Sequence, residues 1–73
     1  IMRKIDLLKL GFKDTSFTDE EILFTEFTLK KEKFTIQIHG ENLVELEVEP
    51  KIWVEIPNCK KISDLKRLIK LFH

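Results

Sequence analysis

Between Ile22 and Ile56 apolar and polar residues alternate almost without interruption. A period of two places successive side chains on opposite faces of a strand, so this alternation predicts strands with one dry face and one solvated face. The alternation keeps its phase through three presumed turns. The chain is therefore expected to fold around an antiparallel sheet whose inward positions form the core.

Three of the strands are defined by their apolar positions. Their inward side chains are Phe34, Ile36 and Ile38, then Val44, Leu46 and Val48, then Ile52, Val54 and Ile56. Two turns are expected between them, because glycine, asparagine and proline favour chain reversal. These turns comprise Gly40, Glu41 and Asn42, and Glu49, Pro50 and Lys51.

The stretch before these strands supports two interpretations. Residues 17–22 match a hydrophobic staple around a capping box, which indicates the start of a helix. Residues 24–29 are alternating and rich in aromatic residues and threonine, which is typical of a strand. We expect a strand over residues 22–30, while a helical start within residues 18–27 remains an alternative.

Matching the inward faces of the strands gives a register. The expected opposite pairs are Leu29 with Phe34, Ile38 with Val44, and Val48 with Ile52. A slip by one residue would expose every inward side chain, so the hydrophobic pattern should hold this register. The same register places Glu45 opposite Glu55. Such a like-charge pair is mildly destabilising, and a cation on a partner would relieve it.

A helix is expected before the sheet. Its apolar stripe comprises Ile1, Ile5, Leu8 and Phe12. Gly11 is suited to end this helix in the left-handed conformation, which would let Phe12 fold back on Leu7. Residues 13–16 then form a loop.

A second helix is expected after the sheet. Ser63 is a suitable N-cap, and Asp64 would lie at the positive end of the helix dipole. The apolar stripe of this helix comprises Leu65, Leu68, Ile69 and Phe72. The sequence thus predicts one α+β domain over residues 1–73. Its architecture is a four-stranded antiparallel β-meander with N- and C-terminal helices packed on one face, in the order α-β-β-β-β-α.

Length, charge and cysteine content limit the classes of protein to which this chain could belong. The chain has 73 residues, a net charge of zero and one cysteine, Cys59. Zero net charge disfavours a typical nucleic-acid-binding protein. A single cysteine excludes an internal disulfide and fits a reducing compartment. No apolar run approaches the roughly 20 residues of a membrane span, so we expect a cytoplasmic protein without a membrane partner.

Residues that could perform chemistry are scattered. Cys59 could pair with His39 or His73, but no spacing signature accompanies them. The acidic run at residues 19–21 is better explained by a charged helix start or loop than by catalytic carboxylates. No metal-ligand pattern or phosphate-binding glycine loop is present in the sequence. We therefore expect no cofactor, no metal and no enzymatic activity.

Two surfaces are candidates for binding. The outward sheet face would expose Phe24, Leu43 and Trp53 among Glu45, Glu47, Glu49 and Glu55. Tryptophan is enriched in interfaces, and surrounding acids would select a basic protein partner. The alternative is a nucleic-acid-binding surface that comprises Lys60, Lys61, Lys66, Arg67 and Lys70. Exposed sheet edges also leave a homodimer as an alternative.

Residues 27–72 resemble the small single-domain proteins of unknown function encoded by phages and other mobile elements of bacteria. The similar features are a lysine-rich turn before Phe34, a glycine turn before Leu43, the strand with Trp53, and a lysine- and leucine-rich last helix that opens at Ser63. The resemblance implies an inhibitor or adaptor that binds and blocks a host protein, for example a defence nuclease. It assigns no role to any single residue.

Overall fold

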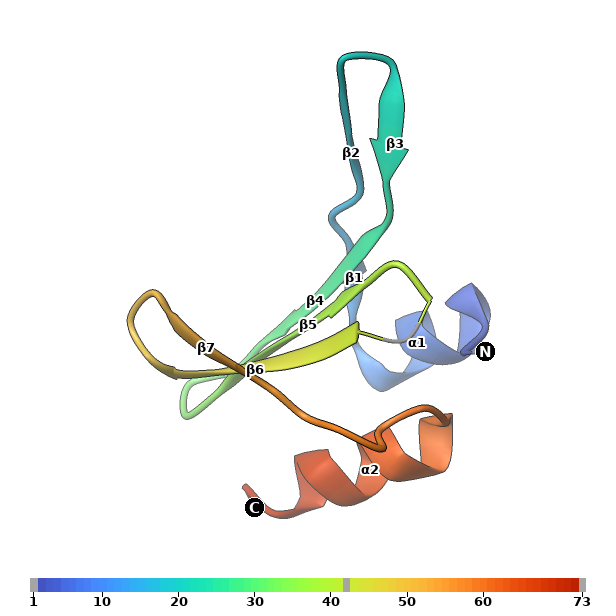
Figure 1. Cartoon of the computed structure of the whole chain (residues 1–73). Coiled ribbons are helices and arrows are strands. Elements are labelled where there is room, and N and C mark those ends of the chain that lie inside the picture. The colour runs from blue at the N-terminus through green and yellow to red at the C-terminus, as the bar shows by residue number, and fades with distance from the viewer. Residues whose placement is uncertain (1, 42, 73) are drawn as a thin grey trace.

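The computed structural model describes residues 2–41 and 43–72. Figure 1 shows a twisted sheet with both helices on one side and a hairpin that projects away from the helices. Three predicted positions lie outside the described residues: Ile1 of the first helical stripe, Asn42 of the glycine turn, and His73.

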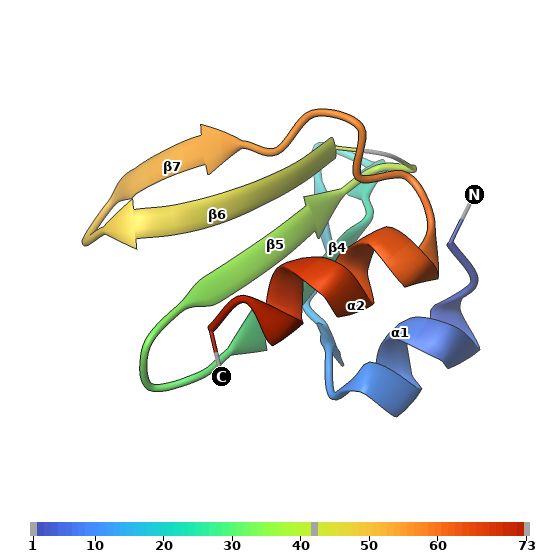
Figure 2. The same ribbon diagram turned by 90° about the horizontal axis from the view of Figure 1, so that it is seen from below.

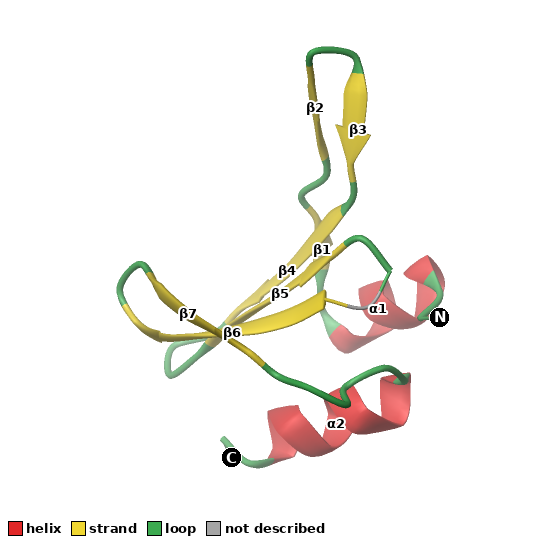
Figure 3. Ribbon diagram, viewed as in Figure 1, coloured by secondary structure: helices red, strands yellow, loops and turns green. Residues whose placement is uncertain are grey.

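The fold is α+β with antiparallel sheets, as predicted, but it has more strands than the predicted meander. The helices are α1 (Lys4–Leu10) and α2 (Ile62–Lys70). One sheet has the order β1-β4-β5-β6-β7, with β1 (Lys13–Asp14), β4 (Glu26–Lys30), β5 (Thr35–His39), β6 (Leu43–Glu49) and β7 (Ile52–Glu55). A second sheet pairs β2 (Phe17–Asp19) with β3 (Ile22–Phe24), and Figure 3 distinguishes both sheets from the helices.

The first additional strand, β1, lies where the sequence predicts a loop. Lys13 and Asp14 pair with Thr28 and Phe27 of β4. The pairing continues at Thr15, whose backbone N–H donates to the Glu26 carbonyl oxygen at 2.8 Å. A two-residue strand carries no readable alternation, so only its contact with β4 reveals it.

The second addition is the β2–β3 hairpin, which the structure places where the predicted strand over residues 22–30 begins. That strand is interrupted at Thr25. Here the Ser16 hydroxyl bonds to both the N–H and the carbonyl of Glu26, at 3.0 and 3.4 Å. These side-chain bonds replace backbone pairing, and the chain beyond them leaves the main sheet. Residues 18–27 therefore form strands around a turn and contain no helix.

The hairpin turn is made by Glu20 and Glu21, which have φ values of 50° and 67°. Positive φ at both central positions matches the twist of a two-residue hairpin, although asparagine and glycine usually fill such positions. A side chain in this conformation costs roughly 1–2 kcal/mol. The hairpin is thus formed by a turn that its own residues do not favour.

The predicted register is correct between β5 and β6, where Ile38 lies opposite Val44. Between β4 and β5 it is wrong by two residues, because Leu29 lies opposite Ile36 and not Phe34. Between β6 and β7 a bulge after Glu47 sets Glu49 opposite Ile52 in place of Val48. A shift of two residues keeps each side chain on its face, so the first error leaves the core unchanged.

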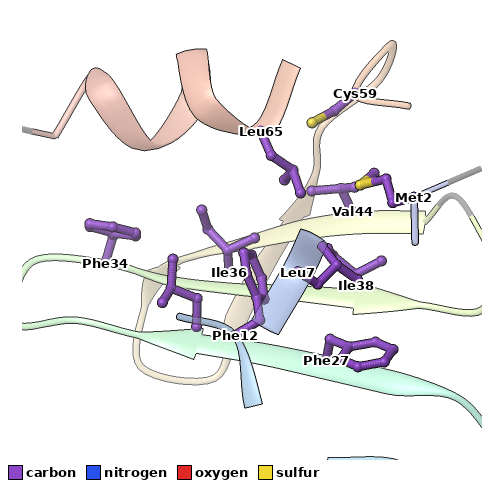
Figure 4. Close-up of a cluster of buried hydrophobic side chains, with 11 residues drawn as sticks. Met2, Leu7, Phe12, Phe27, Phe34, Ile36, Ile38, Val44, Cys59 and Leu65 are labelled. Carbon is purple, nitrogen blue, oxygen red and sulfur yellow. The ribbon is translucent and has the colours of Figure 1, made fainter. Parts of the chain in front are cut away.

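The core lies between the sheet and the two helices. The buried residues on the sheet side are Phe27, Leu29, Ile36, Ile38 and Val44, together with Phe34 directly before β5. Figure 4 shows most of them facing Leu65 of α2 and Leu7 of α1. The predicted stripe of α2 is confirmed: Leu65 is fully buried, while Leu68, Ile69 and Phe72 pack against the core. Figure 2 shows that the helices cover β4 and β5, whereas β6 and β7 extend past α2.

The apolar stripe of α1 differs from the predicted one. Leu7 is buried, while Ile5 and Leu8 are exposed. The predicted end of the helix is correct: Gly11 has φ 103°, and the Phe12 N–H donates to the Leu7 carbonyl at 3.1 Å. This reversal buries Phe12 beside Leu7, as expected.

The start of α2 also differs. Lys61, not Ser63, is the N-cap residue, and Ser63 lies inside the helix. Asp64 accepts the backbone N–H groups of Lys60 and Lys61, each at 3.1 Å. These bonds hold the pKa of Asp64 below its usual value. The carboxylate at N3 thereby reaches back to the N–H groups of the N-cap residue and the residue before it, as the acid of a capping box does.

Candidate functional site

The candidate site is the outer face, defined as the sheet surface opposite the helices. Residues that pair across antiparallel strands share a face, so the register places its members. Leu43 lies beside His39, Glu45 lies between Gln37 and Glu55, and Glu47 lies between Thr35 and Trp53. Five of the seven residues predicted for the outward sheet face thus lie close together: Leu43, Glu45, Glu47, Trp53 and Glu55.

Phe24 is the predicted site residue that lies elsewhere. It belongs to β3, and its ring stacks on Phe17 of β2 with 5.3 Å between the ring centroids. The prediction assumed one strand over residues 22–30, and the break at Thr25 removes Phe24 from that strand. Glu49 also departs from the predicted face, because the bulge aligns it with Ile52.

Negative charge is concentrated where β6 meets β7. Glu45 lies directly opposite Glu55, as the register predicted. Like charges in this arrangement repel each other. The cation-forming group in contact with this pair is the His39 imidazole, whose Nε2 lies 3.1 Å from Glu45 Oε1.

His39 also contacts a second carboxylate. Its Nδ1 lies 3.4 Å from Glu26 Oε2, so the ring connects β4 with β6 across β5. Each ring nitrogen of His39 therefore faces a carboxylate oxygen. The sequence placed His39 on the outward side, but only the register shows that both acids reach it.

Trp53 is partly buried, and it lies opposite Glu47. The Glu47 carboxylate accepts the backbone N–H of Lys51 at 3.0 Å. This bond supports the β6–β7 turn, where Lys51 has φ 68°. Glu47 therefore has a structural role, whereas Glu55 is exposed and makes no hydrogen bond or ion pair among the described residues.

The basic residues of the alternative site all have exposed side chains: Lys60, Lys61, Lys66, Arg67 and Lys70. Helical geometry sets Lys66, Arg67 and Lys70 opposite the apolar stripe that contains Leu65. Asp64 reduces this positive charge, since one of its oxygens lies 4.0 Å from Arg67. The basic surface and the outer face are on different sides of the molecule (Figure 1).

Cys59 is buried in the core, on the helix side of the sheet (Figure 4). Burial raises the pKa of its thiol, and the nearby Asp64 carboxylate raises it further. His39 lies on the outer face, so the structure does not bring Cys59 and His39 together. Within residues 2–41 and 43–72, no group of three or more His, Cys, Asp or Glu side chains is placed to hold a metal ion.

A groove of about 500 Å³ lies between α1, the base of the hairpin and one end of the sheet. Apolar side chains line much of it, including Met2, Leu23 and Phe27. An ion pair borders it, because Lys4 Nζ lies 3.1 Å from Asp14 Oδ2. Hydrogen bonds from Ser16, followed by the Lys4 charge, lower the pKa of Asp14 to about 2.

Comparison of the chain with protein-family models, with curated proteins and with solved structures finds no match. In the part of the chain that the structure describes, no helix is long and apolar enough to cross a membrane.

Proposed function

We propose that this chain is a non-enzymatic protein-binding module that binds a basic protein surface with its outer face. The observation that carries the proposal is the Glu45–Glu55 pair beside Trp53. A fold gains nothing from two carboxylates placed opposite each other. A lysine or arginine of a partner would be attracted to both, and the adjacent Trp53 ring would add apolar contact area.

The mechanism would be steric occlusion. A sheet face with acidic side chains imitates the charge of a nucleic-acid backbone, so it can cover a basic channel or groove on the target. Such binding fits an inhibitor or adaptor of the kind that mobile elements direct against host proteins. Attraction between the charges would mainly speed association, while Trp53 would mainly slow dissociation.

Trp53 also provides the assay, because it is the only tryptophan of the chain. Its fluorescence should change when a basic peptide such as oligoarginine is added at low ionic strength. The Glu55→Lys variant should weaken this response strongly. Glu41→Lys, which makes the same change at an exposed turn residue away from the face, should leave it nearly unchanged. Equal responses of both variants would refute a specific acidic site.

The natural partner can be sought with the same variants. Proteins captured from host lysate by the wild type and by Glu41→Lys, but not by Glu55→Lys or Trp53→Ala, are the expected partners. Circular dichroism should first show that each variant is folded. Capture that is indifferent to both outer-face substitutions would exclude this face.

Nucleic-acid binding by α2 and the two residues before it is the second candidate, because five basic side chains are exposed there: Lys60, Lys61, Lys66, Arg67 and Lys70. Binding through Lys66, Arg67 and Lys70 should weaken steeply as salt is raised. A mobility-shift titration with DNA and RNA at low ionic strength would test it. Absence of a shift, or a shift that Lys66→Glu with Lys70→Glu leaves unchanged, would reject this candidate.

A further inference from the structure

The β2–β3 hairpin, called the arm from here on, exposes an unusual amount of apolar surface. Its side chains Phe17, Ile22, Leu23 and Phe24 are between 44% and 67% exposed. The arm projects beyond the main sheet, and among the described residues its strands pair only with each other (Figure 1). A lone two-stranded hairpin is marginally stable in water, and the two glutamates in its turn make this one less stable still. Burying the apolar side chains of the arm against another surface would therefore stabilise the hairpin.

A second apolar surface is left open on the helix side of β6 and β7. It is called the floor and comprises Val48, Ile52 and Val54, which are between 46% and 52% exposed. Val54 lies opposite Leu46, which packs against the core, so the floor continues the core beyond the edge of α2. Figure 2 shows why it is uncovered: β6 and β7 lie beyond the edge of α2.

We propose that the arm of one chain packs on the floor of a second copy of the same chain, and that the second arm packs on the first floor. A two-fold axis makes the two contacts identical, so one arrangement covers all four surfaces. Each copy of the chain carries both an arm and a floor, so two copies can cover each other's exposed surfaces without a different partner protein. A homodimer of this kind leaves both outer faces free, so it is independent of the proposed function.

The exposed apolar area is of a suitable size. Phe17, Ile22 and Phe24 share one face of the arm, while Leu23 lies on the other. These three side chains and the floor side chains together offer roughly 400 Å² on each chain, from about half of each side chain's area. A stable complex buries roughly 800 Å² on each partner, of which the polar rim supplies a large share.

The charges at the two surfaces are only partly complementary. The tip of the arm carries Asp19, Glu20 and Glu21, all exposed. Lys31 and Lys33 line a depression that also includes Val48, and Lys51 lies in the adjacent turn. Lys30, Glu32, Glu47 and Glu49 line the same depression, and the bulge sets Glu49 opposite Ile52 of the floor. The charges there nearly cancel, so the attraction should be weak and should fall further in salt.

The test uses two double variants and their mixture. The arm variant is Phe17→Ser with Phe24→Ser, and the floor variant is Ile52→Ser with Val54→Ser. Sedimentation equilibrium should show a monomer–dimer equilibrium for the wild type. Each variant alone should raise the dimer dissociation constant at least about tenfold. Mixed in equal amounts they should associate more tightly than either alone, because the mixed pair retains one intact arm–floor contact.

Leu71→Ser is the control, since Leu71 is exposed and belongs to neither surface. It should dimerise like the wild type. Circular dichroism should show that all variants are folded, and single substitutions at Phe24 and Val54 replace any double variant that is not.

Three outcomes would overturn the proposal. The first is a wild type that stays monomeric at its highest soluble concentration; if this monomer binds lipid vesicles through the arm, a membrane is the occupant. The second is a floor variant that dimerises normally, which would indicate arm–arm packing, and the third is a mixture that associates no more tightly than either variant alone.

Discussion

Replacing Glu55 with lysine separates the structural contribution of the outer face from its proposed function. In the wild type, Glu55 lies directly opposite Glu45 on β6. Like charges at such a position cost a few tenths to about 1 kcal/mol, and opposite charges contribute a similar amount. Because Glu55 is exposed, solvent screening reduces both terms. We therefore expect Glu55→Lys to increase the free energy of unfolding by about 1 kcal/mol at low ionic strength.

The measurement is urea unfolding of wild type and variant, followed by Trp53 fluorescence and by circular dichroism. The gain should shrink in 1 M salt, where the screening length falls to about 3 Å. Glu41→Lys makes the same change of net charge without a carboxylate opposite and should shift the midpoint little. The expected result is a variant that is more stable and yet binds a basic partner less well.

A Glu55→Lys variant that is less stable than the wild type would refute this reasoning. It would mean that the Glu45–Glu55 pair is already neutralised within the fold, by His39 or by solvent. A stability gain of equal size in Glu41→Lys would show that the effect is one of net charge. Either result would remove the observation on which the proposed function depends.

Three further predictions concern the fold. Leu65→Ala should lower the free energy of unfolding by roughly 2–5 kcal/mol in urea titrations, because Leu65 is fully buried between α2 and the sheet. As a control, Leu71→Ala should change the free energy of unfolding by less than about 0.5 kcal/mol, because Leu71 is 77% exposed. Gly11→Ala should cost about 1 kcal/mol by the same measurement, since φ 103° is unfavourable for any side chain, and an unchanged midpoint would contradict the cap geometry. Asp14 has a pKa of about 2, below its usual 3.8, so its charged form stabilises the fold above pH 3.8 and this contribution disappears as the pH falls towards 2. In urea titrations Asp14→Asn should therefore be less stable than the wild type at pH 5 and about equally stable near pH 2. A difference in stability that does not change with pH would contradict the low pKa of Asp14.

The site was only partly predictable from the sequence. The alternation of apolar and polar residues placed Leu43, Glu45, Trp53 and their neighbours on one face, and matching the apolar residues of neighbouring strands predicted the Glu45–Glu55 pair. Phe24 was misplaced, because alternation continues through Thr25 even though the strand does not. The bonds from Ser16 to Glu26 break the strand, and a contact between residues ten positions apart leaves no trace in a local pattern.

The first helix shows the same limit. Its segment holds apolar residues at 5, 7, 8, 10 and 12, so more than one apolar stripe can be drawn on it. Helical spacing alone favoured the stripe through Ile5 and Leu8. In the structure the sheet selects Leu7 as the buried residue, and the reversal at Gly11 brings Phe12 in beside it.

By itself the sequence determined the antiparallel strands β5 to β7, the buried positions of β5 and the apolar stripe of α2, whereas the predicted inward residues Val48, Ile52 and Val54 are exposed. Each of these depends on the spacing of residues that are close in the chain, and burial of one face enforces that spacing. Only the tertiary structure decided the pairing of β1, the departure of the arm, the bulge after Glu47 and the rotation of α1. These depend on which distant segments meet, and that choice follows from packing of the whole chain.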